Sequence, residues 1–147
     1  MNITQRRWFK LLVLLSRFGL AAMFLFAAGA KLYTVRDFAG NVANLVGTSW
    51  AWPATVFVIT AELTTALLLI APRTVRLGAA LAALLLVGFA AYALFYVYVQ
   101  HGEPLECGCF GKLIASQLGV STAKRNLLLL VPTLIVLFGY RQRERLP

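Results

Sequence analysis

Two cysteines are the residues of this chain best suited to chemistry, and only one residue separates them. Cys107 and Cys109 flank Gly108, and the sequence contains no other cysteine. A disulfide needs Cα atoms about 4.4–6.8 Å apart, and a glycine relaxes the backbone toward that geometry. Closing so short a loop adds little to fold stability, so a purely structural staple explains the pair poorly. The spacing favours an accessible dithiol that undergoes thiol–disulfide exchange.

Two other roles for the cysteine pair stay open from the residues alone. A reduced pair binds soft ions such as Cu(I) or Hg(II), which makes soft-metal binding or transport the alternative function. Zinc would need further ligands. The remaining alternative is an inert pair in a non-enzymatic scaffold.

The charged neighbours of the dithiol act on it in opposite directions. Glu103 and Glu106 are expected to raise the pKa of the thiols by repelling a thiolate, whereas Lys112 is expected to lower it. His101 is a candidate proton acceptor, although a single loop histidine is more often simply solvated. The sequence leaves the net direction of the pKa shift open.

The elements that must hold this loop are apolar and long. Hydrophobic residues make up 61% of the chain and charged residues only 13%, against about a quarter charged in soluble domains. A membrane span needs about 20 residues. The fourth apolar block is short and contains Pro132, so it either begins earlier or lets Lys124 and Arg125 snorkel outward. We predict an all-α integral membrane protein, a four-transmembrane-helix bundle in a single domain over residues 1–147, with spans at about 11–30, 53–71, 78–100 and 124–141.

The start of the chain has features of an export signal. Ala28-Gly29-Ala30 mimics a cleavage site, and Arg6-Arg7 suggests a twin-arginine signal. The apolar run is long for a signal peptide, it contains Arg17, and further spans follow it. We therefore expect a retained first span.

The predicted outer loops cover residues 31–52 and 101–123. In the first of them, Phe38, Val42 and Leu45 recur at helical spacing. This pattern predicts a short amphipathic helix that lies on the membrane or tucks over the bundle.

Basic residues predict the orientation in the membrane. The side with both termini carries eight basic residues and the other side five, Lys31, Arg36, Lys112, Lys124 and Arg125. The positive-inside rule then puts both termini in the cytoplasm and the Cys-Gly-Cys loop outside, in the periplasm if the membrane is a bacterial inner membrane. The same rule accounts for the net charge of +9 without nucleic acid as a partner.

Two ionisable residues lie within the predicted spans. A charge at such depth costs at least a few kcal/mol, about 2.5–3.5 on insertion scales, so Arg17 and Glu62 each need a partner. Their estimated depths differ by about one helical turn, so we expect them to pair. A structural clasp is the favoured explanation, and a site for a proton or a quinone headgroup is the alternative. Three glycines, Gly19, Gly29 and Gly88, are expected to permit close helix packing.

Several short motifs along the chain resemble those of one membrane family. They are Arg17-Phe18, Gly29-Ala30-Lys31-Leu32, Glu62, Cys107-Gly108-Cys109-Phe110-Gly111 and Arg125-Asn126. Together they resemble the MauE/DoxX group of redox-associated membrane proteins, named for a methylamine-utilisation protein, over about residues 11 to 141.

The resemblance implies a four-helix bundle that works with a periplasmic thioredoxin-like protein, or directly with an exported thiol substrate, in disulfide formation. It makes Cys107 and Cys109 the exchanging pair. The resemblance also implies that four polar residues support the exchanging pair: Arg17, Lys31, Glu62 and Arg125.

We therefore predict a membrane thiol–disulfide oxidoreductase or electron relay. The chain has one dithiol and no second one to pass electrons onward. A membrane quinone is the economical acceptor and the one candidate cofactor, and we assign no residue as a metal ligand.

Overall fold

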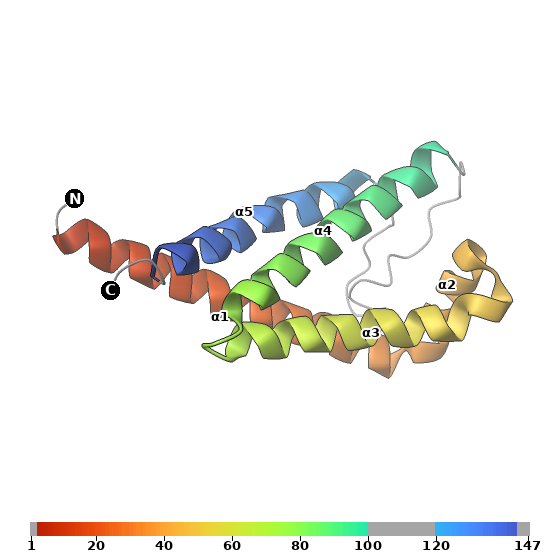
Figure 1. Ribbon diagram of the computed structural model, residues 1–147. Coiled ribbons are helices and arrows are strands. Elements are labelled where there is room, and N and C mark those ends of the chain that lie inside the picture. The colour runs from red at the N-terminus through yellow and green to blue at the C-terminus, as the bar shows by residue number, and fades with distance from the viewer. Residues whose placement is uncertain (1–2, 100–119, 144–147) are drawn as a thin grey trace.

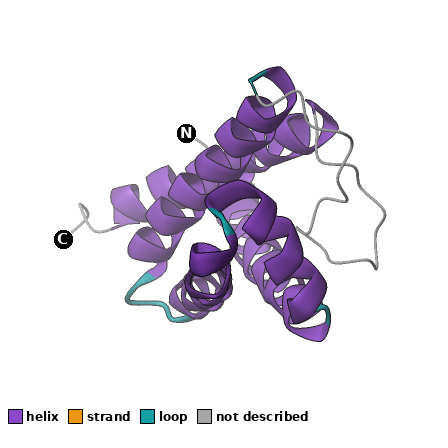
Figure 2. Cartoon of the chain, turned by 90° about the vertical axis from the view of Figure 1, so that its right-hand side faces the viewer, coloured by secondary structure: helices purple, strands orange, loops and turns teal. Residues whose placement is uncertain are grey.

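The computed structural model describes residues 3–99 and 120–143, and everything within these ranges is helix or short turn. Figure 2 shows helices joined by brief loops, with no strand in the described part of the chain. The helices are α1 (Ile3–Tyr33), α2 (Val35–Val46), α3 (Thr48–Ile70), α4 (Val75–Tyr98) and α5 (Val120–Arg143).

Within the described residues, four helices are long and apolar enough to cross a membrane: α1, α3, α4 and α5. The predicted all-α, four-span architecture is confirmed, and the chain is a multi-pass membrane protein. All four of these helices start earlier than the predicted spans, α1 at Ile3 and α4 at Val75. Helix α5 begins at Val120, and α3 begins at Thr48, ahead of Pro53. Pro53 is the sixth residue of α3, in its second turn, where a proline removes one intrahelical hydrogen bond.

The bundle has two distinct ends (Figure 1). The start of α1, the end of α5 and the turn between α3 and α4 lie toward one of them, here called the terminal end. Helix α2, the end of α4 and the start of α5 lie toward the other, here called the loop end. The chain therefore leaves α4 and enters α5 at the end opposite its own termini.

Helix α2 fills the loop between the first two spans, as predicted. Its residues Ala39 and Val42 are buried, and the helix packs mainly on α3. Gly47 has φ of +83°, a left-handed conformation that residues with a side chain rarely adopt, and it separates α2 from α3. This turn folds α2 over the bundle at the loop end (Figure 1).

The main apolar cluster lies in the terminal half of the bundle. It brings together buried residues of all four long helices, among them Phe24, Ala66, Leu69, Ala79, Leu86 and Val136. Alanines permit this close approach.

The expectation for the glycines was wrong. A Cβ placed on Gly19, Gly29 or Gly88 would meet no atom within 4 Å, so close packing does not require glycine there. Tight contacts are instead at Gly139, where a Cβ would lie 2.7 Å from a Val13 methyl carbon, and at Gly78, where it would lie 2.8 Å from the Leu69 amide nitrogen. The Gly78 contact is with backbone and not with a side chain. Gly78 lets α4 pack directly against the end of α3.

Candidate intramembrane site

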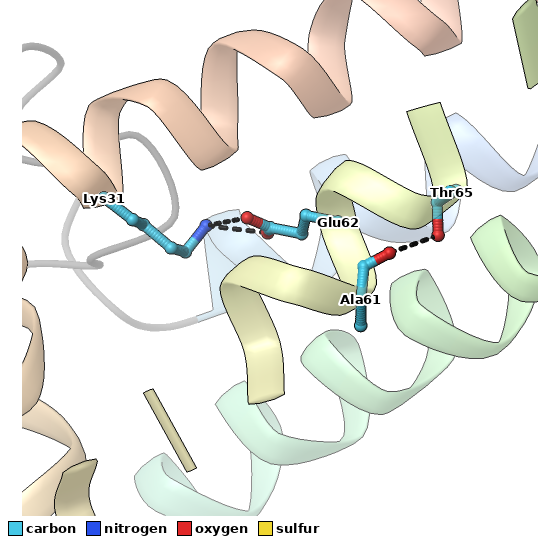
Figure 3. A network of polar contacts seen from close by, with 4 residues as sticks. All are labelled: Lys31, Ala61, Glu62 and Thr65. Carbon is cyan, nitrogen blue, oxygen red and sulfur yellow. Dashed lines mark hydrogen bonds and ion pairs between the residues drawn. The ribbon is translucent and has the colours of Figure 1, made fainter. Parts of the chain in front are cut away.

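A buried ion pair between α1 and α3 forms the centre of the candidate site. Lys31 reaches from the last turn of α1 and Glu62 from the second half of α3, and the two side chains point toward each other (Figure 3). The Lys31 ammonium donates to both carboxylate oxygens, at 2.7 Å to Oε1 and 3.0 Å to Oε2. Each side chain is only 2% exposed. In a membrane the pairing lets both charges exist at a depth that neither would tolerate alone.

Aromatic rings from two further helices enclose the ammonium. The Lys31 nitrogen lies 5.5 Å from the ring centre of Phe38 in α2 and 5.9 Å from that of Phe89 in α4. At these distances the electron-rich ring faces attract a cation. Helix α2 thus covers the ion pair at the loop end, which gives the amphipathic helix a defined place in the site.

A small pocket adjoins Glu62 and is lined by all four long helices. Its polar wall consists of Glu62 together with Arg125 and Asn126 of α5. Its other walls are apolar: Met23, Phe24, Ala27, Leu86, Phe89 and Leu129. Asn126 is 5% exposed, and its side-chain Nδ2 has no hydrogen-bond partner within the part of the chain that the structure describes. The pocket therefore offers a hydrogen-bond donor beside a buried carboxylate.

The expected pair between Arg17 and Glu62 is absent, and that prediction was wrong. Arg17 lies at the terminal end, where its Nε donates to the Leu69 carbonyl at 2.6 Å and a second guanidinium nitrogen donates to the Ile70 carbonyl. A third bond, of 2.7 Å, joins the guanidinium to the Tyr140 hydroxyl of α5. Arg17 holds the end of α3 and takes no part in the Glu62 site.

The structure brings together three of the four supporting residues expected from the sequence. Lys31 and Glu62 form the ion pair, and Arg125 lines the pocket beside Glu62. The direct Lys31–Glu62 pairing was missed because Lys31 stands at a helix end and was counted as a loop charge. The candidate exchanging pair, Cys107 and Cys109, and the candidate proton acceptor His101 lie outside the described residues.

Asn126 is a site residue that sequence reasoning left unassigned, although it stood in a motif beside Arg125. An asparagine within an apolar run was the available signal, because a buried amide needs hydrogen-bond partners.

Comparison with known proteins places the chain in a family. No curated protein and no solved structure matches it. A family model described as methylamine utilisation protein MauE matches residues 9–139. That range contains all four membrane helices nearly in full, together with the Lys31–Glu62 pair. The chain belongs to the MauE family of membrane proteins.

Proposed function

We propose that this protein is a membrane thiol–disulfide oxidoreductase, or electron relay, that uses Cys107 and Cys109 as its exchanging pair. The observation that carries the proposal is the Cys107-Gly108-Cys109 sequence in a MauE family membrane protein. Family membership fits a redox-associated role in a membrane. The short spacing adds a physical reason, because a small disulfide ring favours exchange over structural support.

The proposed reaction begins with a dithiol outside the membrane. A thiolate of a thioredoxin-like protein, or of an exported substrate, attacks the Cys107–Cys109 disulfide and forms a mixed disulfide. The second thiolate of that partner then breaks the mixed disulfide. The partner leaves oxidised, and Cys107 and Cys109 remain as two thiols that hold the electron pair.

A membrane quinone is the proposed acceptor of these electrons. Two thiols and one quinone give one disulfide and one quinol, so two electrons and two protons are transferred and no further reactant is needed. The sequence contains only two cysteines, so the reduced Cys107–Cys109 pair has no second cysteine pair in the chain to which it could pass its electrons. This is the reason for proposing a quinone. Purified protein that oxidises a dithiol no faster with added quinone than without it would exclude this acceptor.

The proposed location is a bacterial inner membrane, with both termini in the cytoplasm and the Cys-Gly-Cys loop outside. The fold supports a common side for the termini, since the start of α1 and the end of α5 lie at the same end of the bundle (Figure 1). Burial of Lys31 against Glu62 supports the charge bias. Without Lys31, the five basic residues of the loop end become four, against eight at the terminal end.

Trapping of the mixed disulfide tests the proposed exchange. A Cys107→Ala or Cys109→Ala variant keeps one thiol, which can attack the disulfide of an oxidised periplasmic thioredoxin-like protein in the reverse of the proposed exchange. This step forms a mixed disulfide and frees one thiol of the partner. Without its second cysteine the variant cannot complete the exchange, so one of the two variants should accumulate this covalent adduct. The adduct should disappear on reduction, and the double Cys107→Ala/Cys109→Ala variant should form none.

The same variants separate the alternatives. A soft-metal protein would bind Cu(I) stoichiometrically through the reduced pair and give no adduct. A scaffold would keep its cellular function in the double variant. Either result, together with the absence of any adduct from both single variants, would overturn the proposed exchange.

A further inference from the structure

The buried polar groups of the bundle differ between its two halves. In the loop half, Glu62 and Lys31 pair with each other, while Thr55 Oγ1 and Asn126 Nδ2 have no hydrogen-bond partner among the described residues. Thr55 is fully buried and lies two turns from Glu62 toward the loop end, on the same face of α3. Asn126 lines the pocket that reaches Glu62. This half therefore holds buried polar atoms whose hydrogen-bonding capacity is unused.

The terminal half contains polar side chains whose bonds are made within the protein. The Thr65 hydroxyl donates to the Ala61 carbonyl at 2.7 Å (Figure 3), and the Thr133 hydroxyl donates to the Leu129 carbonyl at 2.8 Å. The Arg17 guanidinium donates hydrogen bonds to the end of α3 and to the Tyr140 hydroxyl. The main apolar cluster lies between Arg17 and Glu62. Thr65 is only one turn from Glu62, but its hydroxyl is bonded to its own helix. Among the described residues, none of the buried side-chain atoms without a hydrogen-bond partner lies in this half.

An unpaired buried polar atom costs about 1–3 kcal/mol, and proteins commonly avoid that cost by binding water. A buried water molecule needs two to four polar partners and a cavity large enough to hold it. The pocket supplies the carboxylate of Glu62 and the amide of Asn126 as polar partners, and its volume is about that of one water molecule. Larger ligands would require the apolar walls to move.

We propose that the loop half of the bundle is a water-binding vestibule that opens Glu62 to the compartment at the loop end, and that the terminal half is a seal. Water bound by Asn126 and Thr55 carries protons to and from the buried carboxylate from that side only. Phe38 and α2 narrow the approach on one flank, next to Lys31. Of the residues that the structure describes, the charged groups that face Glu62 are Lys31 from α1 and Arg125 from α5.

This inference deepens the proposed function and, in its chemical use, rests on it. Oxidation of two thiols to a disulfide releases two protons, and reduction of the proposed quinone consumes two. A one-sided vestibule lets Glu62 exchange protons with the compartment in which the dithiol reacts, while the seal prevents a proton leak across the membrane.

Substituted-cysteine labelling tests the vestibule. In full-length protein with Cys107→Ser and Cys109→Ser, single cysteines are introduced as Thr55→Cys or Asn126→Cys in the loop half. Ala66→Cys and Thr133→Cys are the matched positions in the terminal half, where Ala66 and Thr133 are also fully buried. The probe is a small, charged, membrane-impermeant thiosulfonate, applied to sealed vesicles of each orientation. It reacts with a thiolate only where water reaches the thiol.

We expect Thr55→Cys and Asn126→Cys to be labelled from the loop-end side only, and Ala66→Cys and Thr133→Cys to resist labelling from both sides. Ser121→Cys, at an exposed position, gives the full labelling expected from the loop end. All variants should label completely after denaturation, and unchanged thermal stability shows that each is folded. If either Thr55→Cys or Asn126→Cys fails to fold, labelling of the other variant tests the vestibule.

Two results would overturn the vestibule: protection of the folded loop-half variants from both sides, or labelling of the terminal-half variants equal to theirs. Because the labelled proteins lack Cys107 and Cys109, these results do not bear on thiol exchange. Failure of the mixed-disulfide trap would overturn thiol exchange and leave the vestibule standing.

Discussion

Lys31 and Glu62 stabilise the bundle only as a pair. Each is almost fully buried, and the two bonds between them satisfy both carboxylate oxygens. Removing one partner leaves the other as an isolated charge in a medium of low dielectric constant, which typically costs about 3–5 kcal/mol. Removing both partners leaves no charge to solvate.

Single substitutions of the pair should therefore destabilise the protein more than the double one. We expect Lys31→Met and Glu62→Met each to lower the free energy of unfolding by about 3–5 kcal/mol. The double variant should recover most of that loss. Reversible unfolding in mixed micelles measures all three.

Lys124→Met is the matched control, because Lys124 lies exposed on α5. Its free energy of unfolding should be close to that of the parent protein. Additive losses in the double variant would show that the two side chains are not coupled.

At the scale of elements, the end of α3 shows how this chain satisfies backbone groups inside a membrane. The last four carbonyls of a helix have no intrahelical donor unless the next residues supply one. In α3 every one of them has a partner: Leu67 accepts from the Ala71 amide, Leu68 from the Thr74 hydroxyl, and Leu69 and Ile70 from Arg17. Arg17 therefore ties α1 to the end of α3, and through Tyr140 to α5.

Replacing Arg17 should lower the free energy of unfolding and the protection of the last turn of α3. Arg17→Met removes the donors of two carbonyls, and each carbonyl left without a partner costs about 1–3 kcal/mol. Tyr140→Phe should cost less, about 1 kcal/mol, because one bond is lost. Hydrogen exchange should quicken in the last turn of α3 in Arg17→Met. Arg36→Met, at an exposed position in α2, should change neither quantity.

The contact between α3 and α4 allows a second test at this scale. Gly78→Ala places a Cβ within 2.8 Å of the Leu69 amide nitrogen and 2.9 Å of the Leu68 carbonyl carbon. Both are backbone atoms, so relief requires the two helices to separate, at about 1–3 kcal/mol. We expect a clear fall in melting temperature. Gly88→Ala is the matched control in the same helix, because its Cβ meets no atom within 4 Å and should be neutral or slightly stabilising. Equal effects would contradict the packing described here.

At the scale of the whole molecule, the two ends of the bundle differ in the kind of residues that they bury. The loop end holds the Lys31–Glu62 pair, its pocket and α2, whereas the terminal end holds the apolar cluster and the α3 cap. The described part of the chain has four helices that can span a membrane, and the start of α1 and the end of α5 lie at the same end of the bundle (Figure 1).

The proposed orientation has a direct test. A green fluorescent protein fused after Pro147 should fluoresce, since the basic terminal end is proposed to face the cytoplasm. Alkaline phosphatase fused at the same point should be inactive, because it needs an oxidising compartment for its disulfides. The opposite pattern would place the Cys-Gly-Cys loop in the cytoplasm and remove the basis for a periplasmic partner.

The sequence by itself determined the membrane class, the four spans and the amphipathic α2. Hydrophobic run length and helical periodicity are local properties, so they survive whatever the tertiary arrangement. It also identified Arg17 and Glu62 as charges that needed partners. The starts of all four long helices were less well predicted, because each helix begins with residues less apolar than its centre.

Only the tertiary structure decided which charges meet. Hydropathy gives approximate depth, but it gives neither the rotation of a helix nor its offset along the bundle. Helix α1 extends past the end of α3 at the terminal end (Figure 1), so Arg17 lies level with Leu69 and Ile70 and not with Glu62. Lys31, near the other end of α1, reaches inward to Glu62 instead. The pocket depends on the same offsets, because its walls come from four helices distant in sequence.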